Sequence, residues 1–93
     1  MALQDRFDLE DLVNESERLV FDALETELAD AIDRVSEEEI LDIAALALNH
    51  VRPRYRVNLL GRLYAQNVSD EERTEVDQAV RSAILKVRPD VKR

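Results

Sequence analysis

The chain has 93 residues, of which 45% are hydrophobic and 37% charged, with one glycine, two prolines and no cysteine. These values indicate one globular domain over residues 1–93 with a modest core, and they exclude disulfides, thiolate metal sites and cysteine nucleophiles. The net charge of −8 disfavours binding to DNA or anionic membranes, and no apolar run approaches the ~20 residues of a membrane span.

The first predicted element is one amphipathic helix over about residues 8–35. Its acidic residues occupy the side opposite the apolar stripe, and Phe21 and Ile32 widen that stripe. A stripe of this width indicates contacts with more than one neighbour. The apolar residues that recur with helical spacing are Leu9, Leu12, Val13, Leu19, Val20, Leu24, Leu28, Ala31 and Val35.

A second helix is predicted over about residues 37–51. Ser36 and Glu39 have the spacing of a capping box at its start, and Pro53 ends it because proline lacks the amide donor. A helix with so few polar residues is expected at the centre of the fold or of a dimer. The polar residues within 40–51 are Asp42, Asn49 and His50.

Residues 54–65 alternate polar and apolar side chains around the single glycine, Gly61, which predicts a short extended excursion or β-hairpin. Ser69 and Glu72 form a second capping box, and a third helix is predicted over about residues 70–88. The predicted fold is therefore mainly α, with three helices, an extended or hairpin excursion between the second and third, and help from a second copy of the chain.

The sequence carries little that could support catalysis. His50 is the only histidine and is expected to cap the carbonyls at the end of its helix, so no metal site is predicted. One glycine cannot form a glycine-rich phosphate loop, and no serine lies on a strand-to-helix elbow. We therefore expect a binding protein without a metal or other cofactor, not an enzyme. An acidic amino terminus without a signal peptide predicts a cytoplasmic location.

Charge is distributed unevenly along the chain. Residues 1–48 hold 15 acidic and 3 basic side chains, whereas residues 49–68 hold 4 arginines and no acid. A guanidinium group can fork onto phosphate oxygens or onto the O6 and N7 edge of guanine, which favours a small anionic ligand at this segment. The alternative is that these arginines form weak surface pairs with the acids of the first helix.

The stretch from Asp42 to Tyr55 reads Asp-Ile-Ala-Ala-Leu-Ala-Leu-Asn-His-Val-Arg-Pro-Arg-Tyr, and residues 61–65 read Gly-Arg-Leu-Tyr-Ala. Together they resemble the signature of the late competence development ComFB family. One branch of that family binds zinc through a Cys-x-x-Cys array. This chain has Val35 to Glu39 at that place, without a cysteine, so it resembles the cysteine-free branch better.

The resemblance implies a homodimeric receptor for the second messenger cyclic di-GMP. It implies that Arg52 and Arg54 contact phosphate or guanine, and that Asn49 hydrogen-bonds a sugar or base. Tyr55 would stack on the ligand or fill the core, and Arg62 would add a further charge. His50 stands where the family commonly has arginine. If that arginine grips the ligand, His50 predicts weaker or pH-dependent binding.

We therefore expect a signalling protein that binds cyclic di-GMP and passes the signal to an unidentified downstream protein by rearranging its dimer. A constitutive protein-interaction module, docking a partner on Phe21 and Ile32 of the first helix, is the first alternative. A purely structural dimer with a non-functional pocket is the second.

Overall fold

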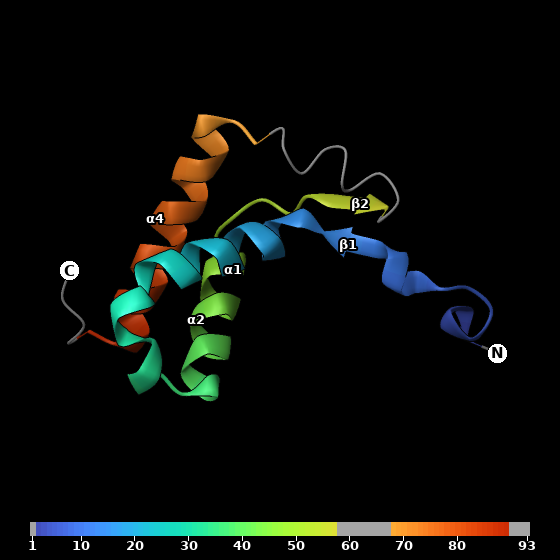
Figure 1. Cartoon of the computed structure of the whole chain (residues 1–93). Coiled ribbons are helices and arrows are strands. Elements are labelled where there is room, and N and C mark those ends of the chain that lie inside the picture. The colour runs from blue at the N-terminus through green and yellow to red at the C-terminus, as the bar shows by residue number, and fades with distance from the viewer. Residues whose placement is uncertain (1, 58–67, 90–93) are drawn as a thin grey trace.

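The computed structural model describes residues 2–57 and 68–89, which form three main helices and a two-stranded antiparallel sheet (Figure 1). The prediction of a mainly helical fold is confirmed. In chain order the elements are the 3-10 turns η1 (Leu3–Asp5) and η2 (Leu9–Asp11), strand β1 (Leu12–Asn14), helix α1 (Glu15–Glu27), the 3-10 helix η3 (Ala29–Arg34), helix α2 (Glu37–Leu48), strand β2 (Tyr55–Val57) and helix α4 (Asp70–Val87).

The prediction of one continuous helix over residues 8–35 is wrong. The segment Leu12–Asn14 is extended, and the Asn14 side chain caps α1 by accepting a hydrogen bond of 3.1 Å from the Ser16 N–H. An asparagine in this role competes with helical backbone bonding, so it starts a helix instead of lying inside one. At its other end, α1 has Leu28 as its carboxyl cap, and the chain passes directly into η3. The apolar residues keep helical spacing across both ends of α1. Periodicity alone therefore predicted one helix where the structure has several elements.

The starts of α2 and α4 lie where their capping boxes predict. Ser36 Oγ accepts a hydrogen bond from the Glu39 N–H, and the Glu39 carboxylate accepts one from the Ser36 N–H. The same reciprocal bonds join Ser69 and Glu72 at the start of α4. Each box satisfies two amides that a helix leaves unpaired at its amino end.

The carboxyl end of α2 differs from the prediction. The helix stops at Leu48 instead of residue 51, and the N–H of His50 already donates to the carbonyl of Ala47, three residues back. This tighter last turn brings the chain out of the helix before Pro53, which cannot continue it. The third predicted helix, in contrast, ends within one residue of its predicted limit.

The core lies between α1, α2 and α4, and each helix contributes to it. Arg88 near the end of α4 pairs with Glu39 in the first turn of α2 at 3.6 Å, so these two helices run antiparallel. Helix α2 was expected at the centre of the fold. It is buried on one side only, because Leu41 on the other side is 60% exposed. The buried core residues are Leu19, Val20, Leu24, Leu28, Ile43, Ala44, Ala47, Val51, Val76, Val80, Ala83 and Ile84.

The extended segment between α2 and α4 is confirmed at Tyr55–Val57, but its strand partner was not predicted. Strand β2 pairs with β1, in a register that places Leu12 opposite Val57 and Asn14 opposite Tyr55. The second half of the predicted hairpin, including Gly61 and residues 63–65, lies outside the described residues.

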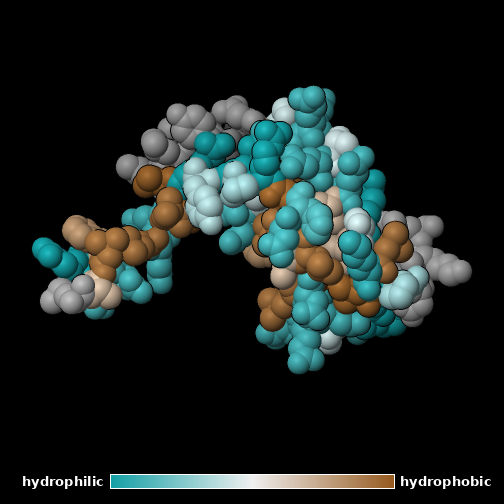
Figure 2. Space-filling view, turned by 180° about the vertical axis from the view of Figure 1, so that it is seen from behind, coloured by the Kyte–Doolittle hydropathy of each residue, from teal (hydrophilic) through white to brown (hydrophobic). Residues whose placement is uncertain are grey.

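The segment before β1 projects from the helical body as an arm (Figure 1). Its two 3-10 turns contain no buried residue. Figure 2 shows apolar atoms along this arm, well separated from the apolar atoms of the body.

The assigned core predicts that substitutions at two positions of α2 differ sharply in their effect on the free energy of unfolding. Ile43→Ala removes a side chain that is 0% exposed, so we expect it to lower the free energy of unfolding by about 2–5 kcal/mol. Leu41→Ala, on the exposed side of the same helix, should change it by no more than about 0.5 kcal/mol. Urea denaturation followed by circular dichroism measures both, and equal losses would contradict the assigned core.

Candidate functional site

The arginine-rich segment after α2 has its backbone fixed by the start of α1. Ser16 Oγ donates a hydrogen bond of 2.5 Å to the carbonyl of Arg52. The N–H of Arg54 donates to Asn14 Oδ1 at 2.7 Å, and the N–H of Glu15 donates to the carbonyl of Arg54 at 2.7 Å. Three hydrogen bonds within three residues leave the main chain of 52–54 little freedom, so the points from which its side chains project are fixed.

Asn14 is central to this arrangement. Its single Oδ1 atom accepts from two backbone amides, that of Ser16 and that of Arg54. One side chain therefore caps α1 and anchors the segment 52–54 at the same time. Val51, which is buried, holds the beginning of the segment to the core.

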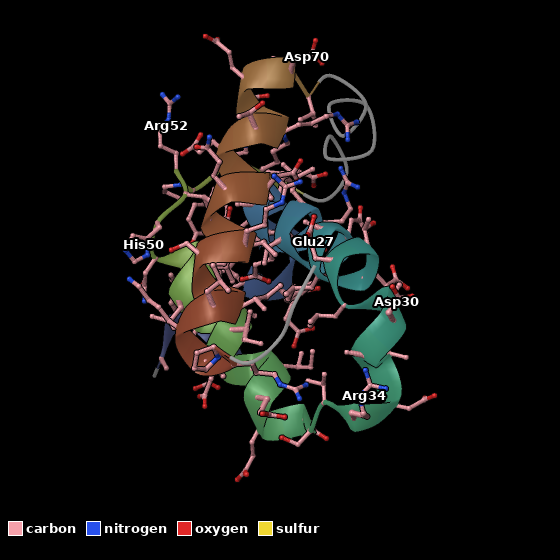
Figure 3. All side chains as sticks on the ribbon, turned by 90° about the vertical axis from the view of Figure 1, so that its left-hand side faces the viewer. Glu27, Asp30, Arg34, His50, Arg52 and Asp70 are labelled. Carbon is pink, nitrogen blue, oxygen red and sulfur yellow. The ribbon has the colours of Figure 1, made fainter. Side chains whose placement is uncertain are left out.

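The two described arginines of the predicted site lie in different surroundings. The side chain of Arg52 is 85% exposed, and its Nε lies 4.0 Å from Glu75 Oε1, the limit of an ion pair. Figure 3 shows it directed away from the helices. Arg54, in contrast, forms an ion pair with Glu72 of α4, and its side chain is only 21% exposed. Screening by water makes the Arg52 contact weak, whereas the half-buried Arg54 pair is screened less.

The expectation that such arginines pair with acids of the first helix is wrong for both of them. Their partners, Glu72 and Glu75, are on α4 instead. The N–H of Arg52 also donates to the Glu75 carboxylate at 3.1 Å. These two carboxylates, one turn apart, hold α4 against the arginine segment.

The remaining predicted residues lie around Arg52 and Arg54. Asn49 follows α2 as its carboxyl cap and is exposed. Tyr55 lies in β2 and is 62% exposed, so it does not fill the core. Arg62 lies outside the described residues. The described residues of the predicted site therefore follow one another along the segment 49–55, in which Asn49, Arg52 and Tyr55 are exposed and Arg54 is paired with Glu72.

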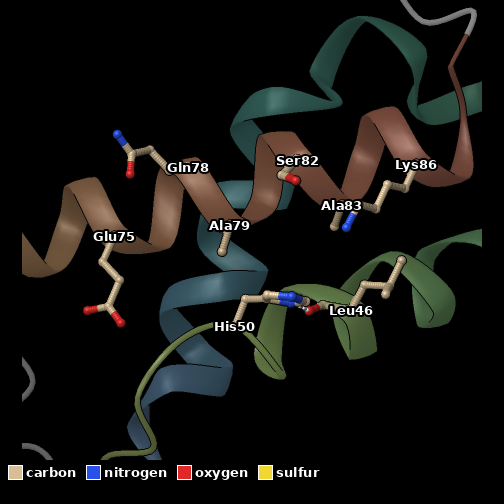
Figure 4. Close-up of a pocket in the computed structure, with 8 residues that line it drawn as sticks. All are labelled: Leu46, His50, Glu75, Gln78, Ala79, Ser82, Ala83 and Lys86. Atoms are coloured by element: carbon tan, nitrogen blue, oxygen red, sulfur yellow. Dashed lines mark hydrogen bonds between the residues drawn. The ribbon is translucent and has the colours of Figure 1, made fainter.

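His50 acts as predicted at the end of α2. Its Nδ1 lies 2.8 Å from the carbonyl oxygen of Leu46, which satisfies one of the carbonyls that the helix end leaves unpaired. The imidazole also lines a groove between α2 and α4, which runs along α4 from Glu75 to Lys86 (Figure 4). The groove has a volume of about 250 Å³ and a floor formed by Ala79 and Ala83.

A shallower hollow adjoins this groove, because Glu75 and Gln78 line both. Arg52 is its basic residue, and Asp70, Glu71 and Glu75 supply three carboxylates. These carboxylates would therefore repel an anion that approached Arg52 from the α4 side.

Reasoning from sequence missed four residues of this site: Asn14, Ser16, Glu72 and Glu75. A signal existed for Asn14, because Glu17 follows three residues later and a hydrophobic pair follows that, which is typical of a helix start. No local pattern identifies the other three as partners of residues 52–54, because the contacts join segments far apart in the chain.

Fold and site together define a small helical domain with an arginine-rich segment between its second helix and its small sheet, and hydrogen bonds hold the backbone of that segment. The chain belongs to the ComFB family, since the family model described as late competence development protein ComFB matches residues 13–90. No curated protein and no solved structure gives a match.

Two further findings concern residues 2–57 and 68–89. Their His, Asp and Glu side chains form no group of three or more that could hold a metal ion. No helix in this part of the chain is long and apolar enough to cross a membrane.

The double role of Asn14 predicts a large effect from one substitution. Asn14→Ala leaves two amides without their acceptor, so we expect a loss of about 1–3 kcal/mol in the free energy of unfolding. Asn49→Ala removes an exposed amide side chain and should cost no more than about 0.5 kcal/mol. Denaturant titration compares the two, and a mild Asn14→Ala variant would argue against this anchor.

Proposed function

We propose that this ComFB chain is a non-enzymatic receptor for cyclic di-GMP, with Arg52 and Tyr55 as the principal contacts. The ligand carries two phosphates and two guanines, and an acid-free stretch with arginines beside an exposed aromatic ring suits both groups. Asn49 lies at one end of this stretch and supplies hydrogen bonds to a sugar or base. Arg62 supplies a further charge.

The observation that carries the proposal is the fixed backbone of residues 52–54. The hydrogen bonds from Asn14, Glu15 and Ser16 are made without ligand. A guanidinium group projecting from a preordered main chain loses less conformational entropy on binding than one on a mobile loop. Arg52 is both preordered in this way and largely exposed.

Arg54 takes part through an exchange of partners. Its guanidinium is neutralised by Glu72, so a phosphate must compete with that carboxylate. The exchange would release Glu72, which lies in the first turn of α4, and so connect ligand binding to the position of that helix. In the proposed mechanism, a second copy and a downstream protein sense this change.

A constitutive protein-interaction module is the second candidate. Phe21 of α1 is 49% exposed and Ile32 of η3 is 52% exposed, and these are the two residues that the sequence singled out for partner docking. This candidate requires no nucleotide, so a binding measurement separates it from the receptor.

Isothermal titration with cyclic di-GMP tests the proposal. We expect the wild-type chain to bind, and Arg52→Ala to weaken binding at least about tenfold, the equivalent of one charge-assisted hydrogen bond. Arg34→Ala is the matched control, since Arg34 is an exposed arginine on η3. No heat from the wild-type chain at high micromolar ligand would remove the receptor function and favour the interaction module.

The partner exchange of Arg54 has its own test. Glu72→Gln keeps the shape of the side chain and removes its charge, so Arg54 no longer needs to leave an anion, and we expect tighter ligand binding by about 2- to 10-fold. Glu38→Gln, at an exposed position in the first turn of α2, controls for the general loss of one negative charge. Equal effects in the two variants would show that Arg54 holds the fold and does not contact the ligand.

A further inference from the structure

The groove between α2 and α4 contains none of the residues assigned to the proposed nucleotide ligand. Figure 4 shows the methyl groups of Ala79 and Ala83 directed from α4 toward α2. Leu46 and His50 line the α2 side. The volume of about 250 Å³ exceeds the roughly 150 Å³ of an apolar cavity that binds benzene. One large apolar side chain of another molecule therefore fits between the two helices.

The α4 side of this groove is one face of the helix. Glu75, Ala79, Ser82 and Lys86 follow one another at spacings of four, three and four residues, which places them on the same side. Glu71, one turn before Glu75, extends this face. The side chains between the charged ends are short, so another backbone can approach α4 closely there. We call this face, together with Leu46, His50 and Ala83, the groove surface.

The two ends of the groove surface carry opposite charge. Glu71 and Glu75 supply carboxylates toward the amino end of α4, and Lys86 supplies an ammonium group in its last turn. Within residues 2–57 and 68–89, neither Glu71 nor Lys86 forms an ion pair. The helical rise separates Glu75 from Lys86 by about 16 Å along the axis. Both charges are therefore available to a partner that spans the groove.

We propose that the groove surface docks an amphipathic helix of another protein, antiparallel to α4. Charge complementarity defines this helix. Its first turn carries an acidic side chain, which lies opposite Lys86. A large apolar side chain then fills the groove over Ala79 and Ala83. A lysine or arginine about three turns from the acid lies opposite Glu71 and Glu75. This order of charges also suits the partner's own dipole, which favours acids at the start of a helix and bases at its end.

A second copy of this chain does not supply such a helix. The face of α4 that lines the groove bears no large apolar side chain. Neither α1 nor α2 has a basic residue in its last turn. The net charge of −8 also favours a partner that is basic overall. The occupant is therefore a different protein, and its docking requires neither the nucleotide nor the exposed Phe21 and Ile32.

Fluorescence anisotropy with a labelled synthetic peptide tests the inference on the full chain without nucleotide. The probe is an alanine-based helix that carries glutamate, leucine and lysine in this order along one face, with the two charges about three turns apart. We expect Ala79→Leu to weaken its binding at least about tenfold, because filling the groove removes the place of the central anchor. Ala45→Leu, at an exposed position of α2, is the matched control and should leave binding unchanged. Circular dichroism checks that both variants keep their helices.

Charge is tested separately with Lys86→Glu, which we expect to weaken binding at least about threefold, against Arg34→Glu on η3, which should have no effect. A second peptide with glutamate and lysine exchanged should bind Lys86→Glu/Glu71→Lys more tightly than the wild-type chain. No binding of the first peptide at about 1 mM wild-type chain would overturn the inference. Equal effects of Ala79→Leu and Ala45→Leu would also overturn it, because the peptide would then lie on another surface.

Discussion

The Asn14 side chain is the point on which the rest of this structure depends. A single carboxamide oxygen accepts the amide that starts α1 and the amide of Arg54, 40 residues further along the chain. It therefore ends β1, begins the first helix and fixes the arginine segment in one place. Because both donors share this acceptor, a movement of the Asn14 side chain would weaken both hydrogen bonds at once.

The two arginines of the segment that Asn14 anchors differ in their exposure to solvent. Arg54 is turned inward against Glu72 and is half-buried, whereas Arg52, only two residues earlier, projects into solvent. The difference arises from the main chain, since an extended segment directs side chains two apart to the same side only while it stays regular, and Pro53 lies between them. A protein of strongly negative charge thus keeps the guanidinium group of Arg52 exposed to solvent.

Much of the helical framework could be predicted because its signals are local. The two capping boxes place the starts of α2 and α4, and Arg52-Pro53 predicts the break after α2. The pairing of β1 with β2 could not be predicted, because three-residue strands carry almost no periodicity and their partners are far apart in sequence. The partner of Arg54 was equally hidden, since the acid-rich first half of the chain made the wrong helix the obvious choice.

Helix α4 is held at each end by an ion pair to a different part of the chain. Its first turn meets the arginine segment through Glu72, while Arg88 beyond its last turn pairs with Glu39, and Ile84 fixes that end in the core. A rod of 18 residues is about 27 Å long. Loosening the contact at Glu72 would therefore free only the first turn of α4, because Val76 and Val80 hold the helix in the core beyond it. A change in charge at Glu72 would alter the surface of that turn while the rest of the helix stays in place.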